Sequence, residues 1–150
     1  MSKEQKIDEI RHSLSHILAM AVLKKFPDAK LGIGPTIENG FYYDFLLPDK
    51  LSDSDLPAIE KEMKRMIKRN IAFEKKITSR DEALKKAKKD KQDFKVELIN
   101  DLPKDEEISF YESDTFSDLC AGPHVKNSGA IKNDAFKITH LAGAYWRGDE

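Results

Sequence analysis

Residues 4–26 read EQKIDEIRHSLSHILAMAVLKKF, and this stretch decides the fold. Apolar residues recur in it at helical spacing, and Pro27 follows it directly, which disfavours a helical conformation at the residue before the proline. We therefore expect one long helix from about Glu4 to Phe26. Projected at ~100° per residue, its apolar side chains form one stripe. The stripe consists of Ile7, Ile10, Leu14, Ile17, Leu18, Ala21 and Val22.

His12 and His16 stand one helical turn apart on the side opposite this stripe. Ala19 and Leu23 continue that side, so it is not an ordinary solvent-facing surface. We expect the helix to be buried on two sides, with both imidazoles facing something other than bulk water. A histidine pair at this spacing can hold a metal, position a water molecule or make hydrogen bonds in a core. Spacing alone leaves all three interpretations open.

The sequence beyond this helix predicts an α+β fold. In it, a mainly antiparallel sheet packs with the long N-terminal helix and further helices. A second helix is expected from Ser52 or Asp53, and Ser79 with Glu82 forms a capping box for a short lysine-rich helix ending near Lys91. The second helix has apolar residues at helical spacing, namely Leu56, Ile59, Met63, Met66 and Ile67. Strands are expected at residues 30–35, 40–47, 71–77, 94–99, 108–113, 136–141 and 144–148, the first two joined by an Asn39-Gly40 turn.

Composition excludes several classes of protein. The 150 residues are 39% hydrophobic, which is enough for a core and argues against wholesale disorder. No apolar run approaches the length of about 18 residues that a transmembrane helix needs, and the N-terminus does not resemble a signal peptide. The single Cys120 has no internal disulfide partner. We expect one domain over residues 1–150 in a soluble, cytoplasmic protein.

Charge is distributed unevenly along the chain although its net value is only −1. Residues 61–95 hold 14 Lys and Arg against 6 Asp and Glu, whereas residues 96–124 hold one Lys against 8 acids. A basic segment can dock the phosphate backbone of a nucleic acid, but it is also typical of solvated helix surfaces. Both interpretations stay open at this point.

A second unusual motif is SDLCAGPHVKN at residues 117–127. Gly122-Pro123 disfavours a helix there, so we expect a tight loop that aims the Cys120 thiol and the His124 imidazole into one pocket. Together with His12 and His16 these side chains also make a plausible tetrahedral zinc set.

Four blocks of this sequence together resemble the editing domain of bacterial-type threonyl-tRNA synthetases, which shares its superfamily with the alanyl-tRNA editing domain. They are RHSLSH (11–16), LGIGPTIENGFYYDF (31–45), FSDLCAGPHV (116–125) and THLAGAYWRGD (139–149). The resemblance implies post-transfer editing, the hydrolysis of the ester of tRNA(Thr) mischarged with serine. It also implies a fragment without the aminoacylation core and the anticodon-binding domain, so ATP would serve only the full synthetase. The expected partners are the seryl-charged tRNA acceptor end and the remainder of that synthetase, with no membrane.

The resemblance also implies roles for individual residues. His12, His16, Cys120 and His124 match the family's HxxxH and CxxxH pairs and would line the catalytic pocket, His124 near the terminal ribose and His12 near the water or the leaving hydroxyl. Lys95 aligns with a lysine that orients water and stabilises an oxyanion, and Asp118 with an acid that holds the substrate's amino group or hydroxyl. Three further residues would bind substrate: Gly34 and Pro35 by close backbone approach and Tyr43 by closing the pocket.

The sequence leaves open whether the site binds zinc and whether the domain is a catalyst or only binds tRNA. The alanyl relatives hold zinc with this kind of ligand set, whereas in the threonyl branch no obligatory metal is implied, so we expect metal-free hydrolysis with no cofactor. Two alternatives stand beside it. One is a zinc-dependent deacylase acting in trans on Ala- or Ser-charged tRNA, with His12, His16, Cys120 and His124 as ligands. The other is a non-catalytic module that docks tRNA.

Overall fold

The computed structural model describes residues 3–32, 36–37, 40–41, 43–46, 53–113, 116–120 and 124–131. The first element is helix α1 (Lys3–Lys25), which ends before Pro27 as predicted. It is followed by strands β1 (Lys30–Leu31), β2 (Thr36–Ile37), β3 (Gly40–Phe41) and β4 (Phe45–Leu46), the 3-10 turn η1 (Asp53–Asp55), helix α2 (Leu56–Lys68), strand β5 (Glu74–Thr78), helices α3 (Arg80–Lys89) and α4 (Asp93–Asp101), strands β6 (Ile108–Ser113) and β7 (Phe116–Leu119), and the turn η2 (Ser128–Ala130). The α+β class is confirmed. The strands expected at 136–141 and 144–148 lie outside the described residues.

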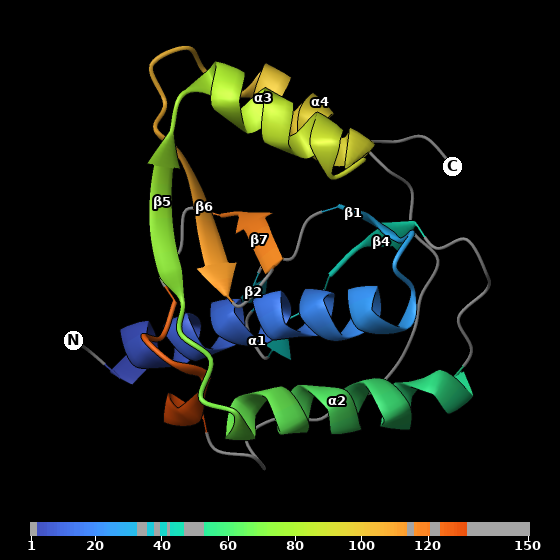
Figure 1. Ribbon diagram of the computed structural model, residues 1–150. Coiled ribbons are helices and arrows are strands. Elements are labelled where there is room, and N and C mark those ends of the chain that lie inside the picture. Colours follow the sequence, from blue (N-terminus) through green and yellow to red (C-terminus); the bar gives the residue numbers. More distant parts are fainter. Residues whose placement is uncertain are drawn as a thin grey trace.

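The centre of the molecule is an antiparallel sheet in the order β5-β6-β7 (Figure 1). In its register Phe110 pairs with Leu119, and Tyr111 pairs with Asp118. Because successive side chains of a strand point to opposite faces, these two pairs lie on opposite faces of the sheet. The register therefore decides which residues of β6 and β7 can contribute to one site.

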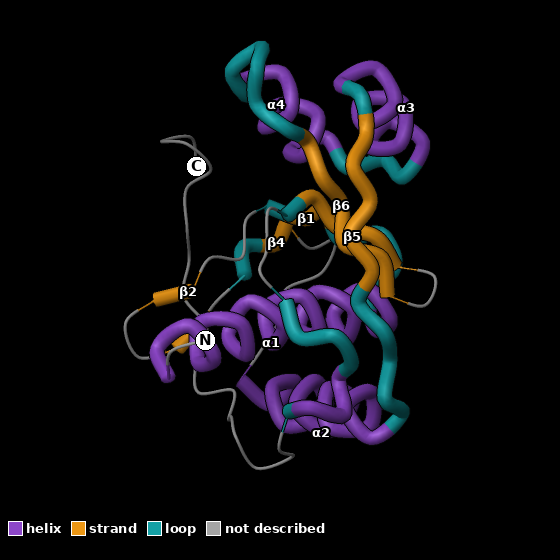
Figure 2. The backbone as a smooth tube through the Cα atoms, turned by 90° about the vertical axis from the view of Figure 1, so that its left-hand side faces the viewer, coloured by secondary structure: helices purple, strands orange, loops and turns teal. Residues whose placement is uncertain are grey.

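One face of the sheet packs against α3 and α4. Ile108 and Phe110 of β6 form a buried cluster with Ala83 and Ala87 of α3 and Ile99 of α4. Figure 2 shows this helix pair on one side of the sheet and α1 with α2 on the other. The Ser79 hydroxyl accepts a hydrogen bond of 3.2 Å from Glu82 N, so the cap predicted at the start of α3 is confirmed.

The other face looks toward α1, which is buried on two sides as predicted. Leu14, Ile17 and Val22 of its apolar stripe are buried, and so is Ala19 on the opposite side. The five apolar residues predicted to share one side of α2 are all buried: Leu56, Ile59, Met63, Met66 and Ile67. The last four belong to the same core cluster as the buried residues of α1. Tyr111 and Phe116 extend this core onto the sheet.

The prediction for residues 94–99 was wrong, because they form helix α4 and not a strand. Phe94, Val96 and Leu98 alternate with other residues, which is the pattern of a strand. The fold instead buries Lys95 and Ile99, one helical turn apart, against the sheet. Tertiary packing has overridden the local pattern, and this places Lys95 in the protein interior.

The start of α4 is tied to the β1 segment by Gln92. Its side-chain oxygen accepts a hydrogen bond from Leu31 N at 2.7 Å, and its amide nitrogen donates to Ala29 O at 3.2 Å. β1 pairs in turn with β4, directly after Tyr43 and Asp44. The two bonds of Gln92 thus hold the helix that carries Lys95 beside the segment that carries Tyr43.

Candidate functional site

His16 lies in the interior, between α1 and the sheet. It is 2% exposed, and its ring makes edge contacts with the rings of Phe73 and Phe116 at centroid distances of 5.1 and 4.8 Å. Neither ring nitrogen has a hydrogen-bond partner among the described residues. Burial lowers the pKa of His16 to about 4, opposed by the charge of Asp118 and supported by that of Lys95. His16 is therefore a neutral imidazole at pH 7.

His124 lies next to His16, with ring centroids 5.3 Å apart. The ring of Phe73 stacks on it in parallel at 5.4 Å, and that of Tyr111 meets it edge-on at 4.2 Å. Burial, together with the neighbouring His16 and His12, lowers the pKa of His124 to about 3. The aromatic contacts hold this second neutral imidazole in one orientation.

The thiol of Cys120 faces His124, with Sγ 3.3 Å from Nε2. Cys120 follows β7 directly, and Ser109 of β6 binds its backbone twice. Cys120 N donates to Ser109 O at 3.1 Å, and Ser109 Oγ donates to Cys120 O at 2.7 Å. The sequence expectation that thiol and imidazole point into one place is confirmed for this pair.

His12 lies at the edge of the cluster. Its ring centroid is 6.1 Å from that of His124, and its Nε2 is 3.5 Å from Asp8 Oδ2, one turn earlier on α1. Its side chain is 22% exposed, against 2% for the whole of His16. The two histidines of the HxxxH pair thus have different environments, one solvent-accessible and one enclosed.

Lys95, Asp118 and Tyr43 form a second group with its own hydrogen bonds. Lys95 Nζ lies 2.8 Å from Asp118 Oδ1 and donates to Tyr43 Oη at 3.0 Å. The Tyr43 hydroxyl donates to Asp118 Oδ2 at 2.6 Å, which closes a triangle of contacts. Lys95 and Asp118 are only 5% and 6% exposed. Burial and the Asp118 charge raise the pKa of Tyr43 well above its usual value, so it stays protonated.

The two groups meet along β7. Asp118 and Cys120 are separated by one residue, so they point to the same side of the strand, toward α1. The charges of Asp118 and Lys95 act on the pKa of His16, and the charge of Asp118 also raises the pKa of Tyr43. A buried ion pair, a phenol, a thiol and two neutral imidazoles thereby lie near the end of β7.

Sequence reasoning missed several residues that build this site. Five residues contact the histidines or the cysteine and hold them in place: Ser13, Phe73, Ser109, Tyr111 and Phe116. The alternating pattern of residues 108–113 could have placed Ser109 and Tyr111 on one face. The two predicted substrate contacts at Gly34 and Pro35 lie outside the described residues.

A metal does not fit this arrangement of side chains. Among the residues that the structure describes, no three or more His, Cys, Asp or Glu side chains lie close enough together to hold an ion. His12, His16, Cys120 and His124 all belong to the described part of the chain. In the described structure they do not converge as the ligands of a tetrahedral zinc site would.

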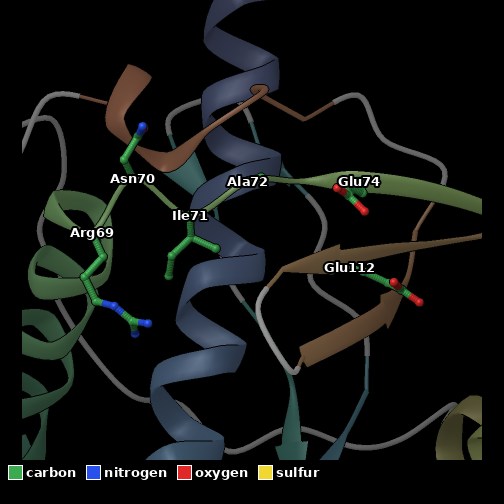
Figure 3. A pocket seen from close by; sticks show the side chains of 6 residues that line it. All are labelled: Arg69, Asn70, Ile71, Ala72, Glu74 and Glu112. Carbon is green, nitrogen blue, oxygen red and sulfur yellow. The ribbon is translucent and has the colours of Figure 1, made fainter.

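A pocket of about 370 Å³ lies elsewhere, where α2 leads into β5. Arg69, Ile71, Glu74 and Glu112 are among its lining residues, and Figure 3 shows the two glutamates on neighbouring strands. They are directly opposite each other in the β5–β6 register. None of the predicted site residues lines this pocket, so it is separate from the histidine cluster.

Comparison with known proteins shows which family this chain resembles. Residues 108–150 match the family described as the threonyl and alanyl tRNA synthetase second additional domain. The chain is 53% identical over 143 residues to a threonine–tRNA ligase of Acetivibrio thermocellus, and the match covers 95% of this chain and 22% of that protein. It is 48% identical over 146 residues to the ligase of Marinobacter nauticus, covering 97% and 22%, and 51% identical over 144 residues to that of Dehalococcoides mccartyi, covering 96% and 24%.

The chain spans between a fifth and a quarter of the length of these curated relatives. The match to each relative runs through both parts of the site, since it covers nearly the whole chain. Within the described residues, no helix is long and apolar enough to cross a membrane.

Proposed function

Since the chain belongs to the threonyl-tRNA synthetase family, we propose that it removes serine from mischarged tRNA(Thr) by hydrolysing the aminoacyl ester. Serine lacks one methyl group of threonine, and binding discriminates such a difference by only ~1–3 kcal/mol. A second site that admits serine and excludes threonine supplies the remaining selectivity. The observation that carries the proposal is the cluster of the Cys120 thiol with two neutral imidazoles, beside a buried Lys95–Asp118 pair whose charges act on His16.

In the proposed reaction, a water oxygen attacks the carbonyl carbon of the ester. The carbonyl oxygen becomes a negatively charged oxyanion, and the bond to the ribose oxygen then breaks. That ribose oxygen leaves with a proton, and free serine is released. The protein must therefore bind a negative charge, orient a water molecule and accept or donate hydrogen bonds to the ribose.

Lys95 is suited to the oxyanion or to the water. Lys95 donates one of the three protons of its ammonium group to Tyr43 Oη, and its charge lies 2.8 Å from Asp118 Oδ1 as an ion pair. The ammonium can donate a further hydrogen bond to a group of the substrate. Because Asp118 and Tyr43 fix the ammonium in a buried place, its charge acts on the reaction with little screening by solvent.

Both oxygens of Asp118 are already engaged, Oδ1 with Lys95 and Oδ2 with Tyr43. This geometry favours Asp118 as the residue that positions Lys95. A carboxylate has about four lone-pair sites, so contact with the substrate's amino group remains compatible with the two existing contacts.

Neutral His16 and His124 are suited to hydrogen bonding and not to carrying charge, because their pKa values are lowered to about 4 and about 3. His16 has two buried nitrogens without partners among the described residues, and such groups cost ~1–3 kcal/mol unless a ligand or water satisfies them. We assign His124 to the terminal ribose and the more accessible His12 to the water or the leaving hydroxyl.

The test is deacylation of Ser-tRNA(Thr) beside Thr-tRNA(Thr) by the purified chain, with and without a chelator. Selective loss of the seryl ester that the chelator leaves unchanged is the expected result. Chelator-sensitive hydrolysis would favour the zinc-dependent alternative, and a chain that binds tRNA without hydrolysing either ester would favour a docking module. His12→Ala and His124→Ala variants should both lose activity, and full activity in both would refute this site.

A further inference from the structure

The hydroxyl of Ser13 links α1 to the segment that carries His124. Ser13 Oγ lies 2.9 Å from Glu9 O, 2.9 Å from Val125 N and 3.2 Å from His124 Nδ1. Ser13 is fully buried, so water does not compete for these contacts. The residue stands between His12 and His16 in the sequence, but two of its partners, His124 and Val125, come more than a hundred residues later in the chain.

Counting protons decides which group donates in each contact. A hydroxyl has one proton to donate and two lone pairs that accept. Glu9 O is a carbonyl oxygen and only accepts, whereas Val125 N–H only donates. The Ser13 proton therefore satisfies Glu9 O, and one lone pair accepts from Val125. The second lone pair faces His124 Nδ1, and that contact is a hydrogen bond only if Nδ1 carries a proton.

The distances agree with this assignment. O–H···O bonds span ~2.5–3.0 Å and N–H···O bonds ~2.7–3.2 Å. The separation of 2.9 Å from Glu9 O fits a hydroxyl donor, and the separation of 3.2 Å from His124 Nδ1 fits a nitrogen donor. The reverse assignment would direct the Ser13 proton to His124 and leave two oxygens, those of Ser13 and Glu9, in contact without a proton between them.

We propose that Ser13 is a positioning residue that holds His124 in the tautomer with its proton on Nδ1 and a free lone pair on Nε2. In a neutral imidazole one nitrogen donates and the other accepts, so the bond at Nδ1 determines the role of Nε2. The contact at the other ring nitrogen agrees with this tautomer. The Cys120 thiol lies 3.3 Å from Nε2 and can donate its proton to the lone pair there.

The functional consequence rests on the proposed editing activity. A ribose hydroxyl that enters the site would donate its hydrogen bond to Nε2 of His124, in the place of the thiol. In the opposite tautomer, Nε2 would be a donor and would present its N–H to that hydroxyl. Ser13, which touches no reacting atom, thereby sets the direction of the hydrogen bond between His124 and the substrate.

The tautomer can be measured without any activity assay. In the chain labelled with nitrogen-15 on its histidines, long-range proton–nitrogen spectra at pH 7 distinguish a protonated from a bare ring nitrogen. A His124→Gln variant identifies the signals of His124. We expect a protonated Nδ1 and a bare Nε2 in the wild type. A protonated Nε2 there would overturn the proposal, whether or not any Ser13 variant folds.

Variants of Ser13 test whether this residue fixes the tautomer of His124. In Ser13→Ala, the bond at Nδ1 is lost, and we expect His124 to populate both tautomers. Ser13→Thr keeps the hydroxyl and should restore the wild-type spectrum, since threonine in a helix makes the same bond to the carbonyl four residues earlier. An unchanged His124 spectrum in folded Ser13→Ala would show that another group fixes the tautomer.

Deacylation of Ser-tRNA(Thr) tests whether the contact between Ser13 and His124 affects the proposed hydrolysis. Ser13→Ala should lower kcat about tenfold, which corresponds to one lost hydrogen bond, and Ser13→Thr should recover most of this loss. The two proposals fail in different ways. An inactive wild-type chain with the expected His124 spectrum would refute the editing function only, whereas an active chain with Nε2 protonated would refute the role of Ser13 only.

Discussion

Lys95 Nζ of α4 lies 2.8 Å from Asp118 Oδ1 of β7, and neither side chain is more than 7% exposed. Two charges buried this deeply are stable only while each has the other, because removal of one leaves the second desolvated and unpaired. The pair therefore joins α4 to β7 and fixes the ammonium beside Tyr43.

Lys95→Met should lower the free energy of unfolding by ~3–5 kcal/mol, since it leaves the Asp118 carboxylate buried without its counter-charge. Asp118→Asn should have an effect of similar size. The double variant should be more stable than the sum of the two losses predicts, because no unpaired charge remains. Urea denaturation curves of the four proteins give the coupling between the two residues.

A surface ion pair provides the control. Lys86 and Asp90 lie one turn apart near the end of α3, 3.2 Å from each other and partly exposed. Lys86→Met should cost no more than ~0.5 kcal/mol. Equal losses for Lys86→Met and Lys95→Met would contradict the interpretation of the Lys95 pair as a buried one.

Stability should fall as the pH drops from about 6.5 to about 4. The pKa of His16 is about 4 in the folded protein and ~6.5 in the unfolded chain, so in this window the unfolded state binds a proton that the folded state excludes. The stabilising effect of neutral His16 is complete above pH 6.5. At pH 4 the loss amounts to ~3 kcal/mol, at 1.36 kcal/mol for each pH unit. His124, with a pKa of about 3, acts in the same direction.

Urea midpoints measured between pH 7 and pH 4 test this linkage. His16→Phe removes the titrating group and retains a ring beside Phe73 and Phe116. Its midpoint should decline less over this window than that of the wild type. Glu62, whose pKa is lowered to about 2 mainly by Arg65, loses its stabilising effect only below pH ~4.5 and so does not explain a decline that starts near pH 6.5.

Much of this fold follows from local pattern. The long helix α1, the cap at Ser79 and the strand at residues 108–113 each depend on residues close together in the sequence, and the structure confirms them, although Ile7 of the predicted stripe is exposed. The pairing of Cys120 with His124 could also be predicted, because Gly122-Pro123 in the sequence between them favours a tight loop. Short-range periodicity and turn chemistry determine these features.

Other parts of the site depend on packing between distant segments. Residues 94–99 alternate like a strand, and only their contact with the sheet makes them a helix that buries Lys95. Ser13 has an unremarkable place in the sequence, and its partner His124 is brought to it by the β6–β7 hairpin. The direction of a hydrogen bond between such residues requires coordinates, because no local pattern encodes it.

Reversal of charge on α3 should weaken the binding of tRNA. Lys85 and Lys89 are exposed and lie one turn apart on this helix. If they contact the acceptor stem, Lys85→Glu/Lys89→Glu should lower affinity and reduce the slope of log K against log salt by about 1 per lost phosphate contact. Lys61→Glu/Lys68→Glu on α2, on the other side of the sheet, is the matched control (Figure 2). Equal effects of both variants would indicate only a general dependence on net charge.

Gly129 should tolerate no side chain while Asn70 is present. Asn70 Oδ1 accepts a hydrogen bond of 3.1 Å from Gly129 N, and a Cβ on Gly129 would lie 2.4 Å from that same oxygen. Asn70 has a φ of 54°, in the left-handed region that glycine adopts at least cost. Gly129→Ala should therefore destabilise the protein by ~1–3 kcal/mol, through the clash and the lost bond.

The clash can be separated from the lost bond by a second substitution. Asn70→Gly removes the side chain that alanine would meet and suits the left-handed backbone, so the double variant Asn70→Gly/Gly129→Ala should recover part of the stability that Gly129→Ala loses. Thermal unfolding of the three variants measures this recovery. If the double variant is less stable than Gly129→Ala, the Asn70 side chain still contributes stability when residue 129 is alanine, and the clash is not the main cause of the loss.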